Sequence, residues 1–101
     1  MQNYIIKQIK ESLKNYKFLK SIADNGNNQA INIIKKIDKA LSLLTSKEQD
    51  IIKLKYIEFN KWIVISNQYD YSIRTCQRIA KSGLLKMSSL YSLHSSQKVV
   101  I

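Results

Sequence analysis

The sequence predicts an all-α fold of about five helices, and three observations support this. Only two glycines, Gly26 and Gly83, occur in 101 residues, and proline is absent, so strong helix breakers are scarce. Apolar residues recur every three or four positions over most of the chain, which is the spacing of one helix face. The length fits one domain with a modest core. We therefore expect a single domain over residues 1–101.

The first expected helix spans residues 3–23 without interruption. Its apolar face steps by three or four residues through Ile6, Ile9, Leu13, Tyr16 and Leu19. The stretch DNGNN at residues 24–28 is suited to positive φ and to side-chain capping, so the helix should end there. Asn27 or Asn28 can cap the helix that follows.

The second expected helix covers residues 29–44 and should pack back on the first. Its core side holds Ile33 or Ile34, Ile37, Leu41 and Leu44. Residues 1–44 would then form an N-terminal helical pair. The apolar faces of this pair could complete the core of the chain or form the seam of a homodimer.

A third helix is predicted to begin near Ser46. Thr45 and Glu48 have the spacing of a capping box, in which each side chain accepts a hydrogen bond from a backbone N–H of the first turn. Ile51, Ile52, Leu54 and Tyr56 are its candidate core residues. Phe59 and Asn60 interrupt the apolar pattern, and a short helix over residues 61–69 follows.

The last expected helix begins at Ile73, after a second interruption at residues 70–72, and ends near Leu90. Ser72 is a good N-cap residue. The inward face should hold Cys76, Ile79 or Ala80, Gly83, Leu84 and Met87. Residues 89–101 are rich in serine, and we expect them to form a frayed tail.

This order of helices is typical of a DNA-binding helix-turn-helix. A short helix and a tight turn hold the second helix at the surface, where its first residues can enter the major groove. We therefore predict a DNA-binding unit over residues 45–88. Lys61 to Tyr69 would form its supporting helix, and Ser72 to Met87 its reading helix.

Charge also indicates a polyanionic partner. Seventeen Lys and Arg residues against seven acids give a net charge of +10, which suits nucleic acid or an acidic membrane surface. An AT-rich genome would explain many lysines without any function, so the two arginines are the more informative cations. Arg74 and Arg78 are four residues apart in the reading helix.

The two arginines should project from the face opposite Cys76, together with Thr75, Gln77 and Lys81. A guanidinium group can donate two parallel hydrogen bonds to guanine O6 and N7, which an ammonium group does less selectively. The two arginines are the candidates for base preference. The alternative is a solvated helix face that binds nothing.

The segment from Leu44 to Met87 resembles sigma-70 region 4, and more closely the sigma-like phage regulators of the ArpU/RinA type, which control late gene expression in Gram-positive phages. The shared features are Leu44 before the capping box, LKYIE at 54–58, Trp62, Ile65, Ser66, Tyr71, Ser72, Arg74, Thr75, Arg78 and GLL at 83–85. Two positions differ, because Asp70 stands where glycine or asparagine is frequent and Val64 where an acid is frequent.

The resemblance implies a sequence-specific binder of double-stranded DNA that regulates transcription in a phage or mobile element. Ser72, Arg74, Thr75, Gln77 and Arg78 would approach bases and phosphates. The resemblance also implies RNA polymerase as a possible partner. The other functions that use such a fold are a DNA packaging or conjugative-transfer accessory protein, of the small terminase or relaxosome type, and a module that mainly contacts polymerase.

Further basic residues are candidates for contacts with the DNA backbone. Trp62 either seals the core or directs its indole N–H toward a phosphate, with Lys55 and Lys61 flanking it. Lys7, Lys10, Lys14 and Lys17 form a stripe on the first helix. This stripe could be a solvated face, a second surface that follows phosphates, or the polar side of a helix resting on a membrane.

Catalysis, cofactors and metals are not expected. Cys76 is the only cysteine and His94 the only histidine, so neither an intramolecular disulfide nor a Cys/His metal cluster can form. No nucleophile, base and orienting group can be nominated together. The longest apolar run, WIVI at 62–65, is far too short to span a membrane. We expect a cytoplasmic protein without enzymatic activity, and Cys76 as a small buried side chain.

Overall fold

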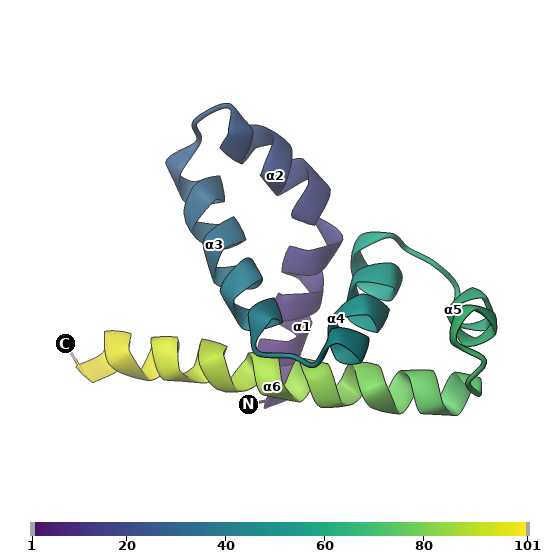
Figure 1. Ribbon diagram of the computed structural model, residues 1–101. Coiled ribbons are helices and arrows are strands. Elements are labelled where there is room, and N and C mark those ends of the chain that lie inside the picture. Colours follow the sequence, from purple (N-terminus) through teal and green to yellow (C-terminus); the bar gives the residue numbers. More distant parts are fainter. Residues whose placement is uncertain (1, 101) are drawn as a thin grey trace.

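The computed structural model describes the backbone of residues 2–100 and the side chains of residues 4–91. Over this range it contains helices and no strands, which confirms the predicted all-α fold class. The helices are α1 (Gln2–Lys14), α2 (Tyr16–Asp24), α3 (Asn28–Ser42), α4 (Ser46–Ile52), the π-helical segment η1 (Lys53–Ile57), α5 (Trp62–Tyr69) and α6 (Ile73–Val100). In Figure 1, α6 lies across the base, α2 and α3 rise from it as a hairpin, and α4 and α5 lie over its N-terminal half.

The first helix is interrupted at Asn15, where we predicted a continuous helix. The Asn15 side-chain Nδ2 and its backbone N–H both donate to the Glu11 carbonyl, at 3.0 and 3.1 Å. Asparagine side chains compete for backbone partners in this way, which weakens a helix interior. The chain bends at this residue, so α1 packs on α6 while α2 pairs with α3 (Figure 1).

The turn between α2 and α3 forms as predicted. Gly26 has a φ of 92°, which glycine adopts without steric cost. The Asn27 side chain then accepts a hydrogen bond of 2.9 Å from the Ala30 N–H and caps α3. Of the two candidates for the core face, Ile34 is buried and Ile33 is exposed.

One apolar core joins both halves of the chain. Fully buried side chains come from α1 (Ile9 and Leu13), from α3 (Ile37), from α4 (Ile51 and Ile52), from α5 (Ile65) and from α6 (Cys76 and Met87). The N-terminal helices thus supply core that the C-terminal helices use. The apolar face of α1 is therefore covered within this chain.

The predicted capping box at Thr45 and Glu48 is present at the start of α4. A π-helical turn at η1, which we did not predict, then ends α4. The Glu58 N–H bonds to the Lys53 carbonyl, five residues back, at 2.9 Å. The chain leaves this turn through Phe59, which has a φ of 61° although it is not glycine.

Helix α6 continues to Val100, ten residues beyond the predicted end near Leu90. No glycine or proline follows Gly83, so nothing in the backbone chemistry stops the helix. The Ser88 and Ser89 hydroxyls donate to the Leu85 carbonyl one turn back, at 2.7 and 3.4 Å, which lets serine remain inside a helix. The predicted helix end near Leu90 is therefore wrong, because α6 continues through the expected tail as far as Val100. Fraying of residues 89–101 stays a prediction, and Ile101 and the His94 side chain lie outside the described residues.

Candidate nucleic-acid interface

The turn between α5 and α6 fixes the direction in which α6 starts. Asp70 takes the left-handed conformation, with φ 57° and ψ 38°, which aspartate tolerates better than most residues. The Tyr71 N–H donates to the Ser66 carbonyl at 3.1 Å, and the Ser66 hydroxyl donates to the Tyr71 carbonyl at 2.5 Å. These two bonds tie the turn to α5.

Ser72 caps α6 as predicted. Its hydroxyl oxygen accepts a hydrogen bond of 3.1 Å from the Thr75 N–H and lies 2.9 Å from the Thr75 hydroxyl. Ser72 is exposed, whereas Thr75 is half-buried. Thr75 therefore helps to hold the helix start in place, and its hydroxyl already has a partner within the chain.

The outer face of α6 carries a row of polar and cationic side chains. Cys76, Ala80, Leu84 and Met87 are buried on the inner face. The exposed row consists of Arg74, Gln77, Arg78 and Lys81. Their spacing of three, four and seven residues places them on one side of the helix. Arg74 and Arg78 thus point to solvent from successive turns, as the sequence predicted.

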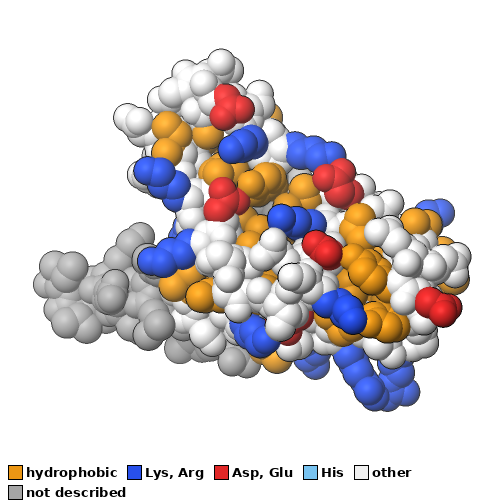
Figure 2. Space-filling model, viewed as in Figure 1, with side chains coloured by type: hydrophobic (Ala, Val, Ile, Leu, Met, Phe, Trp, Pro, Cys, Tyr) orange, Lys and Arg blue, Asp and Glu red, His pale blue; other side chains and the backbone are white. Residues whose placement is uncertain are grey.

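The charged side chains of α6 itself have a single sign. The sequence contains no acidic residue after Asp70, so α6 contributes cations alone. Figure 2 shows Lys and Arg side chains projecting together beneath the N-terminal half of α6. The partial positive charge at the N-terminus of a helix adds to this field. The surface is therefore suited to a polyanion.

Trp62 takes the packing role that the sequence offered as one of two alternatives, and a contact of its indole N–H with a phosphate stays a prediction. The side chain is half-buried and packs against the core. The Lys55 Nζ lies 4.9 Å from the centroid of its indole ring, a cation–π contact. Lys61 precedes α5 and is exposed. Lys55, Lys61 and Trp62 are thus gathered at the N-terminal end of α5.

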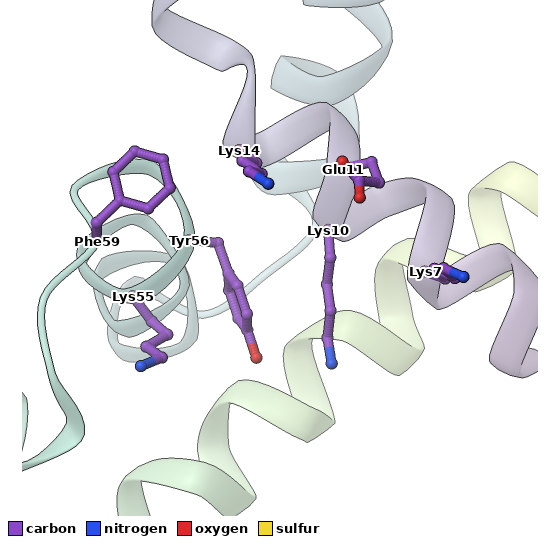
Figure 3. A pocket seen from close by; sticks show the side chains of 7 residues that line it. All are labelled: Lys7, Lys10, Glu11, Lys14, Lys55, Tyr56 and Phe59. Carbon is purple, nitrogen blue, oxygen red and sulfur yellow. The ribbon is translucent and has the colours of Figure 1, made fainter.

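The lysine stripe of the first helix is divided by the bend at Asn15. Lys17 forms an ion pair of 2.7 Å with Glu58. Lys7, Lys10 and Lys14 instead line a groove of about 430 Å³ between α1 and η1, together with Glu11, Lys55, Tyr56 and Phe59 (Figure 3). Sequence reasoning did not link Tyr56 and Phe59 to these lysines, because the π-helical turn that presents them has no evident sequence signal.

A comparison with protein families places the chain in one of them. A family model described as "Protein of unknown function (DUF722)" matches residues 2–88. The chain belongs to this family. The matched region of this DUF722 member runs from α1 into α6 and includes all of the predicted interface residues. No curated protein and no solved structure matches the chain.

Three further findings bear on what this DUF722 member could do. Among the described residues, no three His, Cys, Asp or Glu side chains are grouped so that they could hold a metal ion. No helix in that part of the chain is both long and apolar enough to cross a bilayer. Cys76 is fully buried, and burial raises the pKa of its thiol, which disfavours the reactive thiolate.

Proposed function

We propose that this chain binds double-stranded DNA in a sequence-dependent way, as a transcription regulator of a phage or mobile element, and that α6 reads the major groove. One observation carries the proposal. Arg74, Gln77, Arg78 and Lys81 form an exposed row on a helix whose opposite face is core and whose start is fixed by a tight turn. A helix held in this way can enter the major groove and bring these side chains to the edges of the bases.

The side chains in the row match known base contacts. A helix with its side chains is about 10–12 Å across, and the major groove of B-DNA is about 12 Å wide. Arg74 and Arg78 can each donate two bonds to a guanine, and Gln77 can pair with the N6 and N7 of an adenine. Lys61 and Lys81 would contact phosphates, which set affinity and position rather than sequence.

The charge pattern favours this function over a solvated face without a ligand. On α3, by comparison, the exposed Lys35 and Lys39 lie beside the exposed Asp38, so their charge is partly offset within the helix. The outer row of α6 has no such neighbour in its own helix. Concentrated charge of one sign is costly unless a partner neutralises it.

Arg74→Ala should relax base preference, whereas Lys61→Ala should weaken binding to all sequences alike. A duplex selected from a random pool, and single-base variants of it, would be titrated by fluorescence anisotropy across a salt series. Loss of a bidentate contact should reduce discrimination at one base pair by about 1–3 kcal/mol. Lys35→Ala on α3 is the charge-matched control and should bind as the unmodified chain does. An equal loss on every duplex for Arg74→Ala and Lys61→Ala would contradict base reading by Arg74.

The surface of α5 favours a second candidate function, contact with another protein such as RNA polymerase. Ile63 and Val64 are 51% and 47% exposed on this short helix, and adjacent exposed apolar side chains are typical of protein contacts. Retention of polymerase on the immobilised chain in the absence of DNA would support this candidate. Ile63→Ser with Val64→Ser should then abolish retention and leave DNA binding intact.

A further inference from the structure

We propose that the groove between α1 and η1 holds the phosphate backbone of the same duplex, outside the base pairs that α6 reads. This inference rests on the proposed function. It assigns a second contact surface to three lysines of α1, Lys7, Lys10 and Lys14, and to Lys55 of η1. The occupant is one strand of flanking DNA.

The groove is strongly cationic and open on one side. Four of its seven lining residues are lysines and one, Glu11, is an acid. Lys7, Lys10 and Lys14 are exposed. Figure 3 shows the Lys10 and Tyr56 side chains extending in the same direction, with Lys55 on the other side of Tyr56. The Lys10 Nζ lies 5.6 Å from the centroid of the Tyr56 ring, so an aromatic wall holds the ammonium group.

The groove is continuous with the start of α5. Lys55 lines the groove and also contacts the indole of Trp62, the first residue of α5. The basic surface therefore runs from α1 across η1 to the helix that precedes the reading helix. A duplex held by α6 has its backbone beside this end of the supporting helix. A strand leaving that point can continue along the lysines of α1.

The length of the lysine row suits a strand of DNA. Lys7 and Lys14 are seven residues apart, which is about 10 Å along a helix. One strand of B-DNA presents a phosphate about every 3.4 Å of the helix axis. The three lysines of the row could therefore contact up to about three phosphates of one strand.

The conformation at Phe59 is a second sign of function at this groove. Phe59 is 62% exposed and has a φ of 61°, a region that bulky side chains rarely occupy. Such strain persists where the surrounding structure imposes it, and it is concentrated at binding sites. Here the strained residue places an aromatic ring at the rim of the lysine groove.

The same surface is poorly suited to a membrane. A helix that rests on a bilayer inserts its apolar face among the lipids. In α1 that face holds Ile9 and Leu13, both of which are fully buried in the protein core. The lysines of α1 are thus available to a polyanion, while the apolar residues are not available to lipid.

The test compares two triple variants on duplexes with different flanks. The chain with Lys7→Gln, Lys10→Gln and Lys14→Gln removes the groove cations. Its matched control, Lys20→Gln, Lys35→Gln and Lys39→Gln, removes the same charge from exposed positions on α2 and α3. Each chain is titrated across a salt series on the selected site with flanks of 2, 6 and 10 base pairs.

We expect the unmodified chain and the control to bind more tightly as the flanks lengthen. The groove variant should lose this dependence on flank length. Its plot of log K against log salt should also be less steep, by about 2 to 3 in the magnitude of the slope. At 0.15 M salt its affinity should fall by about 100-fold, while its preference among single-base variants is kept.

Two outcomes would overturn the inference while leaving the proposed function in place. One is a salt slope and flank dependence in the groove variant equal to those of the control. The other is binding to vesicles of anionic phospholipid that depends on the three lysines, together with duplex binding that does not. A chain that binds all duplexes equally would instead overturn the proposed function, and the groove inference with it.

Discussion

Glu48 shows how one side chain can have a role that its sequence position only partly reveals. The capping box predicted its bond to the Thr45 N–H, which the structure places at 3.0 Å. The carboxylate also accepts hydrogen bonds of 2.7 Å from Ser82 and 2.9 Å from Lys86, both on α6. Glu48 is 6% exposed. The same group therefore begins α4 and ties it to α6.

Stability should depend on the ionisation of Glu48 in acid. Burial by itself raises the pKa of this carboxyl, but hydrogen bonds from Lys86, the Thr45 N–H and Ser82 outweigh it and lower the pKa from 4.5 to about 2. Because the folded pKa is depressed, the contribution is complete above about pH 4.5 and is lost as the pH falls toward 2.

Glu48→Gln should lower the free energy of unfolding by about 2 kcal/mol at pH 7. It should also reduce the loss of stability that accompanies a fall in pH from 4.5 to 2. Urea unfolding at a series of pH values would measure both effects. Asp24→Asn, at an exposed position in the last turn of α2, is the control and should change little. An unaltered decline in the Glu48→Gln chain would show that other groups cause it.

Among the helices, the starts that combine a periodic apolar face with a capping signal were predicted well, whereas the end of α6 was not. Asn27, Thr45 and Ser72 cap their helices as expected. The bend at Asn15 and the π-helical turn at η1 were missed. Both are local changes of backbone hydrogen bonding that leave the apolar spacing intact, so periodicity does not detect them.

The close approach of α4 and α6 depends on Gly83. A Cβ atom at this position would lie 2.5 Å from Ile52 Cδ1 and 3.4 Å from both Glu48 Cβ and Leu44 Cδ1. Gly83→Val should therefore displace the Ile52 side chain and crowd the α4–α6 contact, at a cost of about 1–3 kcal/mol of stability.

Thermal and urea unfolding would measure the loss caused by Gly83→Val. Gln77→Val, at an exposed position on the same helix, is the control for a valine in α6 without crowding and should cost only a few tenths of a kcal/mol, whereas helix propensity alone would favour Gly83→Val. Equal losses in the two chains would argue against a tight α4–α6 contact.

The chain as a unit depends on core that crosses between its halves. Leu13 of α1 is fully buried in the same cluster as Ile65 of α5 and Cys76 of α6. Leu13→Ala should lower the free energy of unfolding by about 2–5 kcal/mol and should shift the unfolding of both halves together. Trp62 is the only tryptophan and lies in the C-terminal half, so its fluorescence reports on the half that is not mutated.

Coincident transitions by Trp62 fluorescence and far-UV circular dichroism, both moved by Leu13→Ala, would establish this coupling. The exposed change Lys14→Ala is the control for the same helix and should leave the transition in place. If the fluorescence transition stays at its original position in the Leu13→Ala chain, the two halves unfold independently.

Much of the candidate interface could be predicted from the sequence because it lies on one helix. Arg74, Gln77, Arg78 and Lys81 occupy neighbouring positions in a segment whose period is evident, so their common outward direction follows from helix geometry. The groove could not be predicted in this way. Lys10 and Tyr56 are far apart in the sequence and are brought together only by the packing of α1 on η1.

By itself the sequence determined the all-α class, the main helix starts, the buried face of α6 and the direction of its two arginines, because local spacing and capping chemistry fix these features. Only the tertiary structure decided that the lysines of α1 would divide, with Lys17 pairing with Glu58 and the others lining a groove beside Lys55. That outcome depends on the bend at Asn15 and on contacts between distant segments, and no local pattern encodes the relative placement of such segments.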